Sequence, residues 1–167
     1  MKFIFLPLIF IFLVHLSCDP KKEAIIHKSA NNNSLSDKMN DSIAVEVSLK
    51  NIVQLVGKKP KDVQLFEKFS LNERLEKLLG SEFTIFRSEW NEETPIESDG
   101  EFAYFTGCKA GACAENKYFI LLDLVDNNIN VINFKNKKSR SFEEGAIIGM
   151  TTKIGEYFDK IRLEQGL

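Results

Sequence analysis

The chain has 167 residues, of which 44% are hydrophobic, and its formal net charge is −2. This length and composition provide one domain with a substantial core and leave no room for two sizeable ones. The slightly acidic balance argues against a nucleic-acid-binding surface. Lysines gather locally at 58–61 and at 135–138, a pattern more typical of solvated turns than of a polyanion-binding patch.

The first 17 residues predict an export signal. Lys2 precedes an apolar run from Phe3 to Leu16, which is short for a membrane-spanning helix and typical of a signal peptide. Cys18 follows a small residue directly after this run, so the segment resembles the lipobox of bacterial lipoproteins, although His15 stands where an aliphatic residue is usual. We predict a lipoprotein-type signal peptide at 1–17, with a plain signal peptide or an uncleaved anchor as the alternatives.

The cysteine count supports the lipoprotein interpretation. The chain has three cysteines, an odd number for an exported protein. Lipidation of Cys18 leaves Cys108 and Cys113 as an even pair, and export places that pair where disulfides persist. We therefore expect a protein anchored by lipid to a membrane of the cell envelope, on its periplasmic or surface side.

Residues 18–42 predict a disordered tether. They are rich in Asn, Ser, Lys and Asp, and such a segment cannot bury enough apolar surface to offset its ordering entropy. As a flexible coil it would span roughly 25 Å, enough to lift a domain off a membrane surface. The remaining residues, 43–167, form the predicted single domain.

The first half of this domain reads as helical. Apolar residues at helical spacing predict a short helix over 49–56, a second segment opened by Pro60, and a third helix over 71–79 that ends at Gly80. Residues 83–90 alternate poorly and predict a strand or an irregular segment.

The second half predicts an antiparallel meander. Strands over 102–106 and 117–125 flank a loop, a second hairpin continues over 129–134, and a charged turn at 136–141 leads to a short edge strand over 142–148. Apolar residues at 154, 157, 158 and 161 then predict a closing helix. Helices, a meander and a final helix indicate an α+β domain with an antiparallel sheet flanked by helices.

The loop between the first two strands is bracketed by Cys108 and Cys113, which predicts a disulfide-pinned hairpin. The closed loop is short, so the loop-entropy model gives about 2 kcal/mol of stabilisation. The bond would also hold the intervening residues in one protruding shape, and a rigid loop avoids an ordering cost when it binds a partner. These residues are Lys109, Ala110, Gly111 and Ala112.

The run GCKAGACAENKYFILLDL, residues 107–124, resembles the signature of the inhibitor of vertebrate lysozyme family, whose members carry a Cys-Lys-x-His-x-Cys loop between two strands. The resemblance extends roughly over 61–162. It implies a central antiparallel sheet flanked by helices, and a loop that enters the lysozyme cleft, where its histidine contacts the two catalytic carboxylates. Here Gly111 replaces that histidine, Ala112 replaces a polar residue, and Lys109 is the only charged side chain left on the loop.

Little catalytic chemistry is available to this domain. It contains no histidine from Ile43 onward, which removes the commonest general base and nucleophile partner. Its carboxylates have no spacing that fixes a catalytic pair, and the cysteine spacing is wider than the redox motif and lacks the other two ligands of a zinc site. We predict no enzyme activity, no metal and no cofactor.

Two functional classes therefore remain. The first is an envelope lipoprotein whose loop, Lys109 to Ala112, binds a lysozyme or another muramidase. The second is an envelope lipoprotein that keeps the scaffold as a structural or ligand-binding protein without lysozyme inhibition. The loss of the histidine at Gly111 favours the second class, because backbone N–H groups and Lys109 are then the only donors left for a carboxylate-lined cleft.

Overall fold

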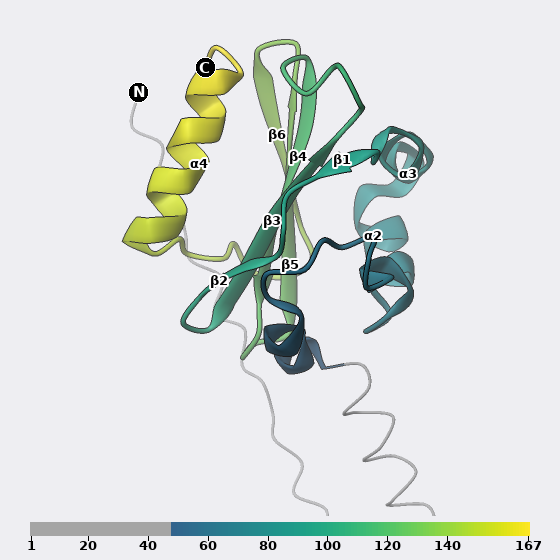
Figure 1. Cartoon of the computed structure of the whole chain (residues 1–167), viewed down its shortest axis with the longest axis vertical. Helices are drawn as coiled ribbons and strands as arrows, with labels where there is room; N and C mark the ends of the chain where they lie inside the picture. The colour runs from purple at the N-terminus through teal and green to yellow at the C-terminus, as the bar shows by residue number, and fades with distance from the viewer. Residues whose placement is uncertain (1–47) are drawn as a thin grey trace, which may run out of the picture. The chain divides into compact units, whose positions relative to one another are not determined.

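The computed structural model describes residues 48–167. The predicted signal peptide, the lipid-attachment site Cys18 and the tether at 18–42 lie outside this range. Within 48–167 no helix is long and apolar enough to cross a bilayer. The fold is a six-stranded antiparallel sheet with α4 on one face and α2 and α3 on the other (Figure 1), which confirms the predicted α+β architecture.

Within residues 48–167, five short helices precede the sheet. They are η1 (Leu49–Leu55), η2 (Leu65–Glu67), α2 (Leu71–Leu79), η3 (Gly80–Glu82) and α3 (Phe83–Glu89), where η denotes a 3₁₀ helix. The prediction of a strand or irregular segment over 83–90 was wrong. Phe83, Phe86 and Trp90 recur at helical spacing and all pack against one hydrophobic cluster, so the burial of these aromatic rings stabilises a helix.

The sheet has the strand order β1-β3-β4-β5-β6. Its strands are β1 (Glu92–Glu93), β2 (Glu97–Asp99), β3 (Phe102–Cys108), β4 (Asn116–Asp123), β5 (Asn128–Lys135) and β6 (Lys138–Glu143). Both β1 and β2 pair with β3, and because β4 occupies the other side of β3, the two short strands share one sheet edge.

The β5–β6 connection is tighter than the sequence suggested. The predicted charged turn over 136–141 was wrong in extent, because β6 begins at Lys138 and only Asn136 and Lys137 form the turn. Both have positive φ, 52° and 58°, as a two-residue hairpin turn requires. The side chains from Lys138 to Ser141 are exposed, because β6 is an edge strand. Edge strands often carry charged residues, so a search for apolar runs does not detect the start of this strand.

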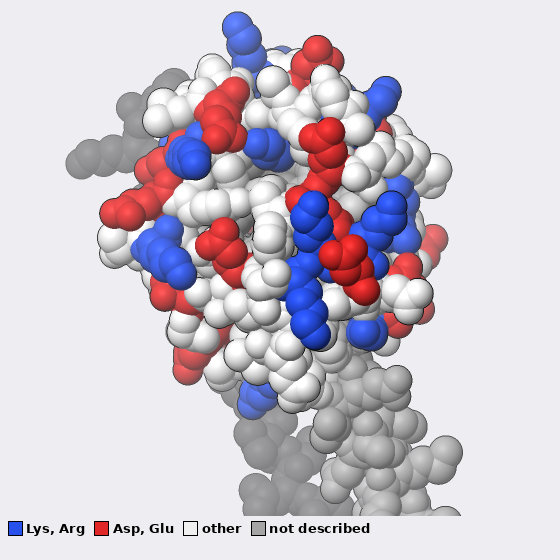
Figure 2. All heavy atoms as spheres, in the orientation of Figure 1, with Lys and Arg blue, Asp and Glu red and all other residues white. Residues whose placement is uncertain are grey.

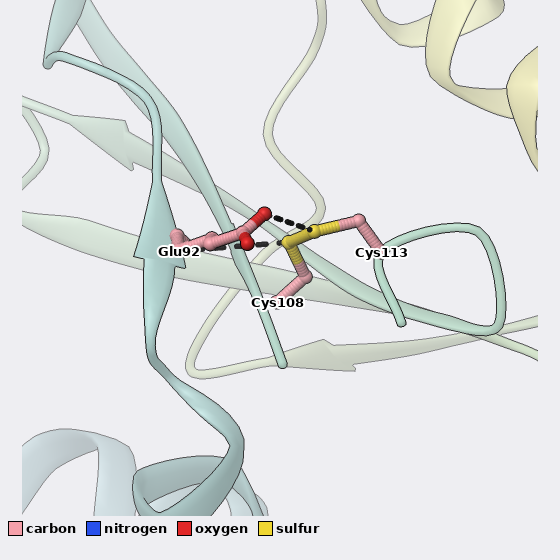
Figure 3. A group of neighbouring side chains, drawn as sticks. All are labelled: Glu92, Cys108 and Cys113. Atoms are coloured by element: carbon pink, nitrogen blue, oxygen red, sulfur yellow. Dashed lines mark hydrogen bonds between the residues drawn. A yellow bond between two sulfur atoms is a disulfide. The ribbon is translucent and has the colours of Figure 1, made fainter. Parts of the chain in front are cut away.

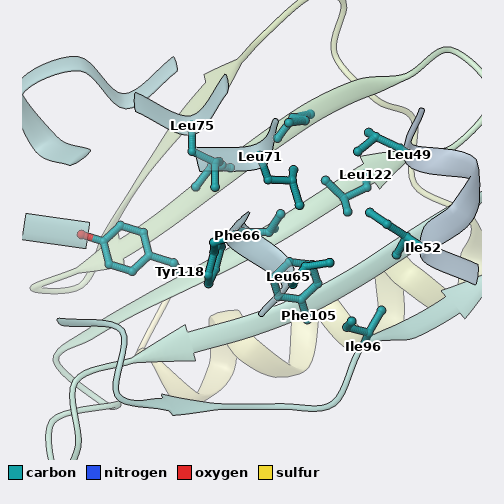
Figure 4. Packing of buried hydrophobic residues seen from close by; sticks show 14 of the residues in the cluster. Leu49, Ile52, Leu65, Phe66, Leu71, Leu75, Ile96, Phe105, Tyr118 and Leu122 are labelled. Atoms are coloured by element: carbon teal, nitrogen blue, oxygen red, sulfur yellow. The ribbon is translucent and has the colours of Figure 1, made fainter. Parts of the chain in front are cut away.

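Alternate residues of the central strands point to opposite faces of the sheet and contribute to two separate hydrophobic cores. Phe105, Ile120, Leu122 and Val131 face the helices η1, η2, α2 and α3 (Figure 4). The intervening residues face α4 (Thr152–Glu164). That second core contains Tyr104, Phe119, Leu121, Phe134, Ile154 and Ile161, with Tyr157 and Phe158 packed against it. The predicted apolar stripe of the last helix is confirmed.

The described chain begins at the end of the sheet opposite the Cys108–Cys113 loop. The Leu49 N–H donates to Asn127 Oδ1 at 3.1 Å, and Asn127 lies in the β4–β5 turn. The loop instead joins β3 to β4, so the eight residues of β4 separate the two ends by roughly 25 Å.

Candidate functional site

The site is the loop that Cys108 and Cys113 close at the end of the β3–β4 hairpin. Cys108 is the last residue of β3, and a disulfide joins it to Cys113 with 5.1 Å between their Cα atoms. This separation lies within the usual range for disulfides. The predicted disulfide is therefore confirmed, and it constrains the predicted partner-binding residues between the two cysteines.

Glu92 of β1 lies beside the disulfide, with its carboxylate pointing toward the two sulfurs (Figure 3). Its Oε1 accepts a hydrogen bond from the Gly111 N–H at 3.3 Å, and its Oε2 lies 3.1 Å from Cys113 Sγ. The carboxylate and the two sulfurs lie within 4.8 Å of one another, and these residue types can bind metals. Because the sulfurs are bonded to each other, they offer no thiolate to a metal ion.

The loop backbone is folded on itself. Gly111 has φ of +73°, a conformation that glycine adopts at little cost. The Ala112 N–H donates to the Lys109 carbonyl at 2.9 Å, and the Glu115 and Asn116 N–H groups donate to the Ala112 carbonyl. The N–H groups of Gly111 and Ala112, which the sequence offered as donors to a partner, are thus already used within the chain.

Lys109 is the one charged side chain between the two cysteines, and it is exposed. Its ammonium group has no partner among residues 48–167, whereas the neighbouring Lys117 is paired with Glu164 at 2.8 Å. Ala110 and Gly111 are also exposed and Ala112 is half-buried. The loop therefore presents a small apolar tip and one free cation.

The base of the loop is held from the side of α4 and from β5. The buried Gln165, directly after α4, donates from Nε2 to the Cys113 carbonyl at 2.8 Å. Asn133 of β5 donates from Nδ2 to Asn116 Oδ1 at 2.7 Å in a buried contact. With Glu92 on the β1 side, three elements fix the position of the loop, and such a preorganised loop loses little entropy on binding.

Trp90, two residues before β1, packs against β3. Its indole ring lies against Gly107, where an added Cβ would fall 2.4 Å from ring carbons. Its Nε1 donates to Glu93 Oε2 at 2.5 Å. The sequence predicted a core or rim position for this lone tryptophan, and the structure places it half-buried against the larger core. By packing on Gly107, Trp90 positions Glu92 beside the loop.

The sequence did not identify Glu92 or Gln165 as part of the site. Glu92 belongs to an acidic connection with no apolar pattern, and Gln165 lies 52 residues from its partner Cys113. No local signal marks either contact. The contact of Glu92 depends on the register of β1 against β3, and the contact of Gln165 depends on where α4 packs in the folded domain.

Comparison with known proteins identifies the family. The family model described as inhibitor of vertebrate lysozyme (Ivy) matches residues 70–159, more than half of the chain. The match runs from the residue before α2 into α4 and includes the whole loop. No curated protein and no solved structure matches the chain. The chain belongs to the inhibitor of vertebrate lysozyme (Ivy) family, as its Cys-Lys-x-x-x-Cys loop predicted.

Proposed function

We propose that this protein is an exported envelope lipoprotein whose disulfide-pinned loop binds the cleft of a muramidase. The observation that carries the proposal is the rigid loop between Cys108 and Cys113, which presents Lys109 as a free cation in a family described by lysozyme inhibition. A carboxylate-lined cleft favours a cation, because charge-assisted hydrogen bonds contribute about 1.5–3 kcal/mol each. The family description names inhibition rather than catalysis, in agreement with the expectation that the chain is not an enzyme.

The orientation of the domain supports presentation from a membrane. If Cys18 carries lipid, the tether enters the domain near Leu49, which is bonded to the β4–β5 turn. The loop lies at the other end of the sheet. A lipid anchor would therefore be attached at the end of the domain opposite the loop, which leaves the loop accessible to a soluble enzyme.

A second function has a specific observation in its favour. Gly111 lacks the side chain with which the family loop contacts the catalytic carboxylates, and the Gly111 and Ala112 N–H groups are used internally. A loop with so few donors fits a structural or ligand-binding envelope protein that keeps the scaffold without inhibiting lysozyme.

An inhibition assay distinguishes the two functions. The purified full-length protein is added to a panel of animal and bacterial muramidases, including chicken-type lysozyme, and lysis of a peptidoglycan suspension is followed by turbidity. We expect inhibition of at least one enzyme, weakened about tenfold by Lys109→Ala because one charge-assisted bond is lost. The exposed Lys50 on η1 provides the control variant Lys50→Ala.

Two results would reject the proposed function. Inhibition of no enzyme in the panel would favour the structural or ligand-binding protein. Equal inhibition by wild type and Lys109→Ala would show that binding does not depend on the Lys109 cation, which carries the proposal.

A further inference from the structure

Three lysines at the β5–β6 turn lie beside the loop. Lys135, Lys137 and Lys138, named here the lysine turn, are all exposed. None of their ammonium groups has a partner among residues 48–167. Two nearby cations differ in this respect, because Arg140 is paired with Glu82 and Lys117 with Glu164. The lysine turn therefore carries three lysines without an ion-pair partner among residues 48–167. The exposed Glu115 lies beside Asn136 and lines the same surface as Lys137, so the cations outnumber the unpaired acid at this end by three to one.

The lysine turn is continuous with the loop. Lys135 is the register partner of Asn116, where the loop ends, and cross-strand neighbours lie about 5 Å apart. The Asn136 N–H donates to the Glu115 carbonyl at 3.1 Å. Any large partner that receives the loop must therefore also meet the lysine turn.

The carboxylates on the β1 side of the loop accept hydrogen bonds from donors of the same chain. Glu92 accepts from the Gly111 N–H, Glu93 accepts from Trp90 and from the Lys61 N–H at 2.7 Å, and Glu89 accepts from the Asn116 amide. These groups bind donors of their own chain, whereas the lysines project into solvent. Figure 2, in the orientation of Figure 1, shows positive and negative side chains interspersed over the surface in view.

A groove adjoins the lysine turn and gives a partner room to dock. It has a volume of about 770 Å³ and lies between α3 and the β5–β6 hairpin. Its lining includes Ile85, Lys135 and Lys138, together with the paired Glu82 and Arg140. An exposed apolar residue beside two unpaired lysines fits a protruding acidic segment of a protein better than an uncharged one.

We propose that the lysine turn is a second contact area, which docks the acidic rim of the muramidase whose cleft receives the loop. This proposal rests on the proposed function, and it further states that the preferred muramidase has an acidic rim around its cleft. Three cations of one sign beside the loop attract an acidic rim before contact, and such steering raises association rates at low salt. The described chain begins at the opposite end of the sheet, and a bilayer covering the lysine turn would also cover the loop, so an enzyme surface is the better occupant.

The test compares two triple variants of the full-length protein. In the first, Lys135, Lys137 and Lys138 are all changed to Gln. In the matched control the same charge is removed elsewhere, at Lys50 of η1, Lys58 after η1 and Lys77 of α2, which are also exposed. Inhibition constants and association rates are measured at 20 and 200 mM NaCl with the enzyme of the panel that wild type inhibits most strongly.

We expect the lysine-turn variant to associate about tenfold more slowly than wild type at low salt and to lose most of this difference at high salt, where charges are screened within roughly 10 Å. The control should behave as wild type at both concentrations. Among enzymes of similar size, wild type should inhibit those with acidic cleft rims more strongly.

Three outcomes would overturn the inference, and they are distinguishable. If Lys109→Ala loses inhibition while both triple variants match wild type, the loop functions and the lysine turn does not contribute. If wild type inhibits no enzyme, the proposed function fails and the inference fails with it. If the lysine-turn variant inhibits normally but loses binding to vesicles of zwitterionic and anionic phospholipid at 3:1, the lysines contact lipid instead.

Discussion

Gly111→His introduces the residue type that the resemblance to the family loop implies at this position, and the geometry of the loop indicates its effect. An added Cβ at Gly111 meets nothing within 4 Å, so there is room for a side chain to leave the backbone at this position. The backbone φ of +73° is unfavourable for a residue with a side chain and costs about 1 kcal/mol of stability. The disulfide and Glu92 hold the loop in place, so this cost should fall on folding rather than on binding.

The imidazole adds a directional donor to the tip of the loop. One charge-assisted hydrogen bond to a cleft carboxylate contributes about 1.5–3 kcal/mol, which corresponds to roughly ten- to a hundredfold in affinity. We therefore expect wild type to inhibit chicken-type lysozyme weakly or not at all, and Gly111→His to inhibit it measurably.

The assay is inhibition of chicken-type lysozyme, with Gly111→Ala as the control because it carries the backbone strain without the imidazole. Peptide mapping under non-reducing conditions verifies that each variant retains the Cys108–Cys113 bond. Strong inhibition by wild type would show that Lys109 and the loop backbone suffice. If Gly111→His keeps its disulfide and inhibits no better than Gly111→Ala, the loop does not enter this cleft and the reasoning is refuted.

Four further predictions address the scaffold and the anchor. Gly107→Ala should lower the free energy of unfolding by about 1–3 kcal/mol, since its Cβ would overlap the Trp90 ring; an unchanged urea midpoint would contradict this packing. Changing Cys108 and Cys113 together to Ser should cost about 2 kcal/mol in the same measurement, and an undiminished stability would show that the bond does not constrain the unfolded chain. Burial and the hydrogen bond to Glu97 raise the pKa of Tyr104 above its ordinary value of 10.0, so the folded protein should ionise this phenol at a higher pH than the unfolded chain does, and stability should fall as pH rises above 10. Ultraviolet titration of the folded protein checks this, and ionisation of Tyr104 at the ordinary pH would contradict it. Cys18→Ala should release the protein from bacterial membranes or leave its precursor unprocessed, whereas mass spectrometry that finds an unmodified wild-type N-terminus elsewhere would reject lipidation.

Local patterns identified the parts of the fold that depend on local chemistry. The β3–β4 hairpin follows from alternating β-formers around a cysteine-bracketed loop, and α4 follows from apolar residues at helical spacing, including Ile154 and Ile161. The α2 stripe and its end at Gly80 follow from the same rule. In these elements propensity, periodicity and tertiary burial agree.

The errors occurred where tertiary contacts override local pattern. The α3 segment contains β-favouring residues, but Phe86 is fully buried against the aromatic rings around it, so packing selects a helix. β1 consists of two glutamates whose backbones pair with Gly107 and Cys108, and no side-chain pattern marks such a strand. β6 begins among charged residues because it is an edge strand.

The functional site also has one part that the sequence predicts and one part that only the folded structure reveals. The loop and its disulfide were predicted from cysteine spacing and from the family resemblance, because both are continuous in sequence. The support given by Glu92 and Gln165 depends on which segments the fold brings together. The consequence for function is specific: support of the loop consumes the Gly111 and Ala112 N–H groups, so Lys109 is the donor on which binding should depend.

The most direct test of the account is competition for the enzyme cleft. Binding of full-length wild type to the muramidase that it inhibits most strongly is measured by calorimetry, with and without a saturating N-acetylglucosamine oligosaccharide that fills the cleft. If the loop occupies the cleft, the apparent Kd should weaken in proportion to the oligosaccharide added, because the two ligands exclude each other. An apparent Kd that stays constant while the cleft is saturated would contradict the account.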